Sequence, residues 1–515
     1  MKRIDKERAL FEQLYKSIQQ PDGTVLPVGA LLQRAAHKFP ESTALIFNNQ
    51  TISFKQLFYQ SVQFGKLIAQ KNIKKNERVL IFVENSPFFY VAYFAAAQLG
   101  AVVVPLNTFL TEQELEHVVH DSSPTLIITS STLYERAQAK AQEIPILTEK
   151  DADLQSNAPD QLPSITISNH ADNEMAVLLY TSGTTGLPKG VMLSSKNIMT
   201  NVLQVIARVN ITDQERVFGI LPLFHSFAQN ICIWASFFLG CTVILLPKID
   251  RRSIFAGLAQ KPTVIVGVPA LYGLFCLLKN LDFENVKYFV SGGDALPDKI
   301  RAGFEIVYGR KICNGYGMTE ASPVIAADLD DVLVPTSTIG RPMVNIECTI
   351  RGDQNKELPP FAIGEIWVKG DNVMLGYYNA PEATKAIIED GWLKTGDLGY
   401  TDDQGRIVIS GRAKDLIAHK GFKIYPQEIE NVLMGHPLVI NVGVIGVKQE
   451  DVGEMPIAYV QVKELTDTTK HELRELCQRK LAAYKVPRDF ICTVDPLPVT
   501  TTNKVDKKVL RKKHQ

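Results

Sequence analysis

The sequence lacks the marks of secreted and thiolate-metal proteins. Its seven cysteines are scattered, without a C-x-x-C pair, so we expect neither a disulfide framework nor a cysteine-based zinc site. The first twenty residues, MKRIDKERALFEQLYKSIQQ, are charged and amphipathic and contain no apolar core of a signal peptide. These absences predict reduced thiols and a cytoplasmic location.

An excess of charge of one sign is also missing. Lysine plus arginine equals aspartate plus glutamate, at 55 each, which argues against nucleic acid as a main partner. The least polar stretch, Ser226–Pro247, has no charged residue, but Gln229, Asn230 and Gly240 interrupt it. We expect a buried helix followed by a buried strand there, with a transmembrane span as the weaker alternative.

Short apolar runs alternate with amphipathic stretches through the first part of the chain. Strands are predicted at Arg78–Glu84, Ala101–Val104 and Thr125–Thr129, with helices at Pro87–Leu99, Glu112–Asp121 and, capped by Ser195, Lys196–Val209. This alternation predicts an α/β fold with a doubly wound parallel sheet. From Thr338 to Gly370 short strands and turns follow one another, which predicts a β-rich subdomain.

The length of 515 residues predicts more than one domain. A turn and a strand at 402–411 are followed by GRAKD, and beyond them lies a region large enough for a small α+β domain. We place the boundary at Arg412–Asp415. The prediction is therefore a large N-terminal domain, 1–411, and a small C-terminal domain, 412–515.

The stretch YTSGTTGLPKG at Tyr180–Gly190 lies between two short apolar runs, so we expect a loop between two strands. Its glycines allow close backbone approach, its hydroxyls donate hydrogen bonds, and Lys189 adds a positive charge. Together they predict a polyphosphate-binding loop. It is not a P-loop, because Pro188 precedes the lysine and Gly190 follows it, where G-K-[ST] is required. The alternative is a hydroxyl-rich linker.

Five further segments could carry chemistry, and each has a plainer structural interpretation. They are NGYGMTE at Asn314–Glu320, SGGDALP at Ser291–Pro297, LKTGDLGY at Leu393–Tyr400, PLFHSF at Pro222–Phe227 and LPVTTTNK at Leu497–Lys504. An aromatic ring at the end of a strand, as at Tyr316, could stack on a base, and Glu320 offers oxygen ligands that suit Mg²⁺. The alternatives are a core tyrosine or histidine, a turn aspartate and a solvated lysine.

Order and spacing favour the functional interpretation. With GEIWVKG and GRAKDLIAHKGFKIYPQEIE added, these segments resemble the ordered motif set of the adenylate-forming superfamily over Thr51–Leu510. That superfamily includes acyl- and aryl-CoA synthetases, peptide-synthetase adenylation domains and beetle luciferases. The likeness is closest to bacterial medium- and long-chain fatty acyl-CoA synthetases, through ASPV at Ala321–Val324, NVMLGYYNAPEAT at Asn372–Thr384 and VPLN at Val104–Asn107.

The resemblance implies a large N-terminal domain, a small mobile C-terminal domain and two half-reactions at the site between them. In the first, a carboxylate attacks the α-phosphate of ATP and gives acyl-AMP and pyrophosphate. In the second, the thiol of coenzyme A attacks the acyl carbon and AMP leaves. The implied ligands are ATP with Mg²⁺, a fatty acid and coenzyme A.

The resemblance also implies residue roles. Residues that would hold the β- and γ-phosphates are Thr181, Ser182, Gly183, Thr184, Thr185 and Lys189. Residues that would bind the nucleoside are Tyr316, stacked on adenine, with Gly293, Asp294, Asn314 and Gly317 beside it, and Asp397 and Arg412 at the ribose. Residues nearer the chemistry are Glu320 on Mg²⁺, Thr319 on the α-phosphate, His225 at the acyl pocket and Lys504 between the carboxylate and the α-phosphate. Lys414 would be the hinge, and Gly421 would lie beside the coenzyme A tunnel.

Three departures from the family pattern concern the acyl site and the C-terminal lysine. Asn503 stands where glycine usually precedes that lysine, Gln229 where a long-chain relative has a gating tryptophan, and Ala228 where glycine is frequent. Chain length therefore stays open. The rival enzymes are an acyl-AMP ligase that loads a carrier protein and a ligase for an aryl or short-chain acid. The rival of another class is a silent acyl- or nucleotide-binding protein. A homodimer and peripheral membrane contact through the basic tail remain open alternatives.

Overall fold

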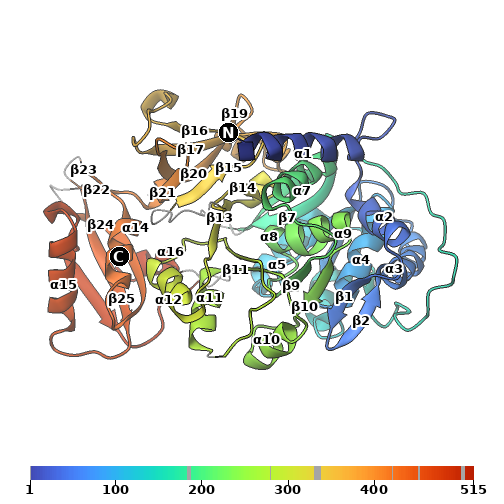
Figure 1. Ribbon diagram of the computed structural model, residues 1–515, viewed down its shortest axis with the longest axis horizontal. Helices are drawn as coiled ribbons and strands as arrows, with labels where there is room; N and C mark the ends of the chain where they lie inside the picture. Colours follow the sequence, from blue (N-terminus) through green and yellow to red (C-terminus); the bar gives the residue numbers. More distant parts are fainter. Residues whose placement is uncertain are drawn as a thin grey trace.

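The computed structural model describes residues 2–181, 187–278, 280–329, 338–419, 422–449, 453–499 and 505–514. The chain forms a large N-terminal part with two extended sheets and a smaller C-terminal part with its own sheet (Figure 1). The long amphipathic helix α1, Lys2–Ile18, lies along the outside of the large part and packs on α7, Ser195–Val209.

The first sheet has seven strands in the order β18-β8-β7-β4-β3-β5-β6. The central pairs β7/β4, β4/β3, β3/β5 and β5/β6 are parallel, whereas β8 and β18 are antiparallel to their neighbours. The strands are β3 Arg78–Phe82, β4 Val102–Pro105, β5 Leu126–Thr129, β6 Ile146–Thr148, β7 Met175–Thr181, β8 Lys189–Ser194 and β18 Gly376–Tyr377. The connecting helices are α4 Pro87–Gln98, α5 Glu112–Ser122 and α6 Tyr134–Ala141.

The second sheet is a parallel block that continues into an antiparallel one. Strands β1, β10, β9, β11, β12 and β13 run parallel, and β14, β15, β21, β20, β17 and β16 extend the sheet in antiparallel order. The parallel strands are β1 Thr43–Phe47, β9 Arg216–Gly219, β10 Thr242–Leu245, β11 Val264–Gly267, β12 Tyr288–Ser291 and β13 Cys313–Gly317, and the hairpin strand β2 is Gln50–Ser53. The antiparallel strands are β14 Val324–Ala327, β15 Thr338–Pro342, β16 Glu347–Arg351, β17 Gly364–Lys369, β19 Ile388–Glu389, β20 Trp392–Thr401 and β21 Ile407–Arg412.

The remaining helices of the large part cover these sheets. They are α2 Leu31–Lys38, α3 Phe54–Ala69, α8 Ser226–Ala228, α9 Ser236–Leu239, α10 Arg251–Leu258, α11 Pro269–Leu277, α12 Asp298–Tyr308 and α13 Pro381–Ile387. Between α8 and α9 the segment Gln229–Ala235 is π-helical.

The C-terminal part has a separate apolar core. Its strands are β22 Ile417–His419, β23 Phe422–Ile424, β24 Val439–Gln449, β25 Gly453–Val462 and β26 Asp489–Thr493, and its helices are α14 Pro426–Met434, α15 Thr469–Lys480 and α16 Lys507–Lys512. Side chains such as Ile424, Leu433 and Val460 belong to one apolar cluster whose members all lie between Ile417 and Cys492. In Figure 1 it lies beside α12, and Lys299 Nζ reaches the carbonyl oxygens of His436 (3.4 Å) and Val439 (3.3 Å).

The structure confirms the predicted α/β class, the parallel sheet and the buried helix and strand within Ser226–Pro247. Among the described residues, none of the helices combines the length and apolarity needed to cross a bilayer. All seven cysteines are free thiols. The cap of α7 was predicted wrongly: the helix begins at Ser195 itself, and Ser194 is the cap, because its hydroxyl accepts from the backbone N–H of Asn197 (3.1 Å).

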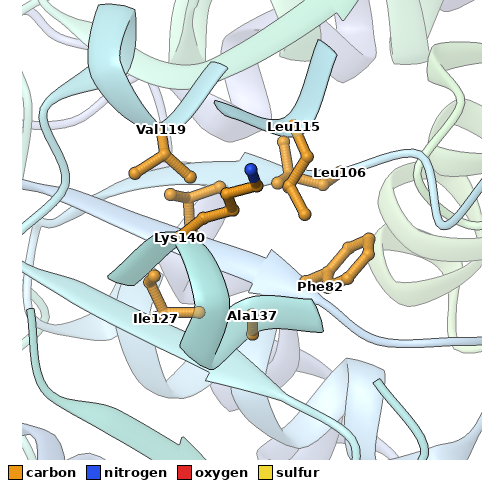
Figure 2. Close-up of a pocket in the computed structure, with 8 residues that line it drawn as sticks. Phe82, Leu106, Leu115, Val119, Ile127, Ala137 and Lys140 are labelled. Carbon is orange, nitrogen blue, oxygen red and sulfur yellow. The ribbon is translucent and has the colours of Figure 1, made fainter. Parts of the chain in front are cut away.

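A small cavity of about 10 Å³ lies within the core of the first sheet, beneath α5 and α6 (Figure 2). Its walls are Leu80, Phe82, Leu106, Leu115, Val119, Ile127, Ala137 and the stem of Lys140. Nζ of Lys140 forms an ion pair with Oε2 of Glu116, 2.9 Å away. A space of this size holds at most about one water molecule, so it is a packing gap and not a ligand site.

Candidate active site

The predicted phosphate loop joins two antiparallel strands, as expected. Tyr180 of β7 pairs with Gly190 of β8, and Thr181 pairs with Lys189. Thr181 and Lys189 are half-buried at the top of this hairpin. The other four predicted phosphate ligands, Ser182, Gly183, Thr184 and Thr185, lie outside the described residues.

The stem of this hairpin is held by helix α5. The hydroxyl of Tyr180 donates to Oδ2 of Asp121 (2.6 Å), and Nε2 of His117 lies 2.9 Å from the carbonyl oxygen of Pro188. Burial and the neighbouring Asp121 carboxylate raise the pKa of Tyr180. A side chain on Gly190 would place its Cβ 2.8 Å from Leu178 and 3.2 Å from the Tyr180 ring, so both neighbours would have to shift to admit it.

Glu320 lies in the short 3₁₀ turn Thr319–Ala321, directly after β13. Its carboxylate is buried, and Oε1 accepts a hydrogen bond from the hydroxyl of Tyr377 (2.6 Å). The ring of Tyr377 also lies 5.2 Å from Nζ of Lys189, a cation–π distance. The structure therefore brings Lys189 and Glu320 to one place, although 131 positions separate them in the sequence.

Thr319, which is buried, contacts the segment that carries His225. Its Oγ1 lies 3.1 Å from Oγ of Ser226, the first residue of α8. His225 caps this helix, and its Nδ1 accepts from the N–H of Phe227 (3.2 Å). This bond makes Nδ1 the acceptor and leaves the proton of a neutral imidazole on Nε2.

Tyr316, Asp397 and Arg412 form one connected unit. The hydroxyl of Tyr316 donates to Oδ2 of Asp397 (2.6 Å), and Nε of Arg412 lies 2.9 Å from Oδ1 of the same carboxylate. Burial and Asp397 raise the pKa of Tyr316, so its hydroxyl remains a donor. Asp397 and Arg412 are direct partners on β20 and β21. The residues predicted for adenine and ribose are thus joined directly to one another.

The segment SGGDALP meets this unit at the same edge of the second sheet. Ser291 of β12 pairs in parallel with Asn314 of β13, so Gly293 and Asp294 follow at the carboxyl ends of the strands, where ligands bind in open α/β sheets. Both are exposed. Asn314 donates from Nδ2 to the carbonyl oxygen of Thr338 (2.9 Å).

The space around position 317 explains why a glycine stands there, without reference to a ligand. A Cβ there would lie 1.9 Å from the carbonyl oxygen of Pro323. The strand β13 therefore turns back on Pro323 at this point, and the turn places Thr319 and Glu320.

Three predicted residues belong to the C-terminal part. Lys414 lies in the exposed turn Ala413–Asp415, next to Arg412. Gly421 and Lys504 lie outside the described residues. Tyr377 was missed by the sequence analysis; its signal was the paired tyrosine after glycine in NVMLGYYNAPEAT, a segment used there only for its likeness to other proteins.

Comparison with known proteins identifies the family. Residues 32–378 match the AMP-binding enzymes, and residues 428–504 match the AMP-binding enzyme C-terminal domain. The chain belongs to the AMP-binding enzyme family. The resemblance to adenylate-forming enzymes inferred from the sequence is thereby confirmed.

Similar AMP-binding enzymes include several CoA ligases. A long-chain-fatty-acid–CoA ligase of Bacillus subtilis (strain 168) is 32% identical, with 92% of each chain covered. A feruloyl-CoA synthase of Amycolatopsis sp is 31% identical over 94% of this chain and 99% of its own. The structure of o-succinylbenzoate coenzyme A synthetase from Bacillus subtilis, in complex with ATP and magnesium ion, has a TM-score of 0.84 and 30% identity, and covers 94% of this chain and 98% of that one. The function expected from the sequence, activation of an acid with ATP and its ligation to coenzyme A, agrees with these relatives.

Proposed function

We propose that this AMP-binding enzyme is a fatty acid–CoA ligase that forms acyl-AMP and then the thioester. The observation that carries the proposal is the closeness of two sets of side chains. Tyr316, in the Tyr316–Asp397–Arg412 unit, lies on β13 only four residues before Glu320, which is linked through Tyr377 to Lys189. The Tyr316–Asp397–Arg412 unit suits the nucleoside, and Lys189 with Glu320 suits the polyphosphate and its magnesium ion. The substrate class follows the fatty-acid ligase of Bacillus subtilis.

In the proposed ATP site, Tyr316 stacks on adenine beside Gly293, Asp294, Asn314 and Gly317, and Asp397 with Arg412 binds the ribose. Thr181 and Lys189, with Ser182, Gly183, Thr184 and Thr185, hold the β- and γ-phosphates. Lys189 therefore anchors the leaving pyrophosphate, because the attack falls on the α-phosphate. Thr319 contacts that phosphate.

Glu320 fits a magnesium ion bound together with ATP. The described residues contain no group of three or more His, Cys, Asp or Glu that could hold a metal alone. Mg²⁺ in nucleotide sites is commonly bound by one or two carboxylates plus phosphate oxygens and water, and one buried carboxylate is what Glu320 offers. When bound, the ion would neutralise phosphate charge.

We further propose that the unit of residues 412–515 moves about Lys414 between the half-reactions. The separate apolar core of this part begins at Ile417, which supports a boundary shortly after Arg412, the last residue of β21. Lys504 would then reach the α-phosphate and the substrate carboxylate during adenylation and offset the charge of two anions that meet. Gly421 would border the path of the coenzyme A thiol during the second step.

The buried amide of Gln229 favours a second candidate substrate, an aryl or hydroxylated acid. This side chain has no exposed surface, and its Oε1 has no hydrogen-bond partner among the described residues. It occupies the position where a long-chain relative has a gating tryptophan. An unpaired acceptor beside an alkyl chain would stay without a hydrogen bond, which costs free energy, whereas a substrate hydroxyl could donate to it. The feruloyl-CoA synthase relative supports the same candidate.

The test is a pyrophosphate-release assay over acids from acetate to palmitate, with benzoate and hydroxycinnamate, each with and without coenzyme A. We expect turnover to rise with alkyl chain length and to need coenzyme A for thioester formation. A preference for hydroxycinnamate would establish the second candidate. Pyrophosphate release with every acid at background would contradict both, and acyl transfer only to a carrier protein would establish an acyl-AMP ligase.

A further inference from the structure

Tyr377 stands between two charged side chains that the proposed mechanism needs separately. Its hydroxyl donates to Oε1 of Glu320 at 2.6 Å, and its ring centroid lies 5.2 Å from Nζ of Lys189. Among the described residues, Lys189 and Glu320 form no ion pair with each other, and Tyr377 contacts both. A tyrosine thus occupies the place where an ammonium and a carboxylate would otherwise meet.

We propose that Tyr377 is a positioning residue that keeps Lys189 and Glu320 apart, so that Lys189 is available to the phosphates of ATP and Glu320 to the magnesium ion. The proposal rests on the proposed function, which assigns those two ligands. In this proposal the ring of Tyr377 holds Lys189, and its hydroxyl orients Glu320.

The physical argument concerns competing partners. A direct ion pair in a partly buried site is strong, because water screens it poorly, and an incoming phosphate would have to break it. The face of an aromatic ring attracts an ammonium more weakly and so releases Lys189 to a phosphate more easily. The hydroxyl donates one hydrogen bond to Glu320 and leaves the other lone pairs of the carboxylate open.

The hydroxyl of Tyr377 is the donor in its contact with Glu320, because an ionised carboxylate can only accept. Tyr377 therefore orients the carboxylate through one short hydrogen bond.

The backbone fixes the ring without help from the hydroxyl. The N–H of Met374 donates to the carbonyl oxygen of Glu320 (2.9 Å), and that of Tyr378 donates to the carbonyl oxygen of Gly190 (2.8 Å). Gly376 and Tyr377 form β18, which pairs with Met192 and Val191 of β8. One short segment is thus tied both to the turn that carries Glu320 and to the strand that carries Lys189, and a phenylalanine would occupy the same place.

The test is calorimetric titration of the full-length protein with ATP at a series of Mg²⁺ concentrations, with AMP as reference ligand. For Tyr377→Phe we expect the Mg²⁺ concentration for half-maximal ATP binding to rise about fivefold to tenfold, since only the carboxylate loses its donor. For Tyr377→Ala we expect, in addition, about tenfold weaker binding of ATP without Mg²⁺, since Lys189 pairs with Glu320. AMP lacks the β- and γ-phosphates, so its affinity should stay within about twofold in both.

Two controls sharpen this experiment. Tyr134→Phe removes a tyrosine hydroxyl from the surface of α6 and should match the wild type in every titration. In a Glu320→Gln background, Tyr377→Phe should produce no further change in the Mg²⁺ requirement, because the two residues act as one unit.

The outcomes separate the inference from the proposed function. An unchanged Mg²⁺ requirement in Tyr377→Phe overturns the role of Tyr377 while ATP binding by the wild type still supports the function. Equal weakening of AMP and ATP binding shows general damage and also overturns it. A wild type that binds no ATP contradicts the proposed function itself, and the inference with it.

Discussion

Asp397 and Arg412 face each other across β20 and β21, with Nε of Arg412 2.9 Å from Oδ1 of Asp397. Arg412 is the last residue of its strand, and the turn Ala413–Asp415 begins directly after it. The proposed ribose site therefore ends where the proposed hinge begins. This arrangement makes Asp397 the residue through which nucleotide binding can be tested most directly.

Asp397→Asn should weaken ATP binding because it removes a negative charge. The Asp397 carboxylate pairs with Arg412 and accepts a hydrogen bond from the hydroxyl of Tyr316. Hydrogen bonds to charged groups contribute about 1.5–3 kcal/mol, so we expect the KM for ATP to rise about tenfold to a hundredfold, with the KM for the acid within about threefold. Pyrophosphate release at varied ATP measures both. The matched control is Asp402→Asn, at the far end of the same two strands, where Asp402 pairs with Arg406 at 2.6 Å. It should lower thermal stability and leave the KM for ATP unchanged; a rise in both variants alike would contradict the assignment.

Gly317→Ala should disturb the turn that places Glu320. Its Cβ would lie 1.9 Å from the carbonyl oxygen of Pro323, and such overpacking typically costs about 1–3 kcal/mol. Gly315→Ala is the control, since its Cβ would come no closer than 3.5 Å to any neighbour and should change the free energy of unfolding by less than about 1 kcal/mol. Urea denaturation followed by fluorescence compares the two. Similar stabilities would refute the steric role of Gly317.

His170 should make the protein less stable below neutral pH. It is buried, with Nε2 3.0 Å from the carbonyl oxygen of Gly100. Burial has the largest effect and lowers its pKa. The hydrogen bond to Gly100 partly opposes this effect, and the smaller effects of Lys75, which lowers the pKa, and Glu174, which raises it, follow. The unfolded chain therefore takes up this proton at a higher pH than the folded chain, so the stabilisation is complete above about pH 6.5 and is lost as the pH falls below it.

The measurement is the free energy of unfolding of the wild type and of His170→Gln at pH 7.5 and 5.5. Other groups titrate in both proteins, so the difference between the two pH dependences isolates His170. We expect the wild type to lose more stability than the variant on acidification. Parallel losses would contradict the role of His170.

Lys504 and Gly421 should separate the two half-reactions. Lys504→Ala is expected to reduce pyrophosphate release at least about a hundredfold, as loss of a preorganised electrostatic group does, and to leave thioester formation from supplied acyl-AMP largely intact. Gly421→Leu should do the reverse, because a large side chain would crowd the thiol path. Loss of both half-reactions in either variant would contradict the role given to that residue.

The sequence predicted local elements well because burial patterns within a strand or helix are local. The strand predicted at Arg78–Glu84 is β3, Arg78–Phe82, and the two ends of the hydroxyl-rich stretch pair with each other in β7 and β8. It did not predict that the parallel block from β1 to β13 continues into the antiparallel strands, because strand pairing between distant segments leaves no local pattern. Ser194 and Ser195 are equally good caps by residue type, and only the position of the first helical turn distinguishes them.

The residues of the candidate site were predicted from sequence motifs, but the contacts between them were not. Tyr316 and Asp397 were assigned to adenine and ribose, but their mutual hydrogen bond spans 81 positions and could not be inferred from spacing. Tyr377 was missed for the same reason: its two partners come from different elements, and its own segment is only two residues of strand.

The pairing of β18 with β8 also sets an order of events during synthesis. Gly376 of β18 pairs with Met192 of β8. The outer edge of β8 therefore stays unpaired until the ribosome has made the chain between Met192 and Gly376. At about 5–20 residues per second, that interval is on the order of ten to forty seconds. A nascent chain that stops before Gly376 therefore lacks Tyr377 and leaves β8 as an unpaired edge strand. The proposed ATP site is therefore completed late, when almost the whole N-terminal part already exists.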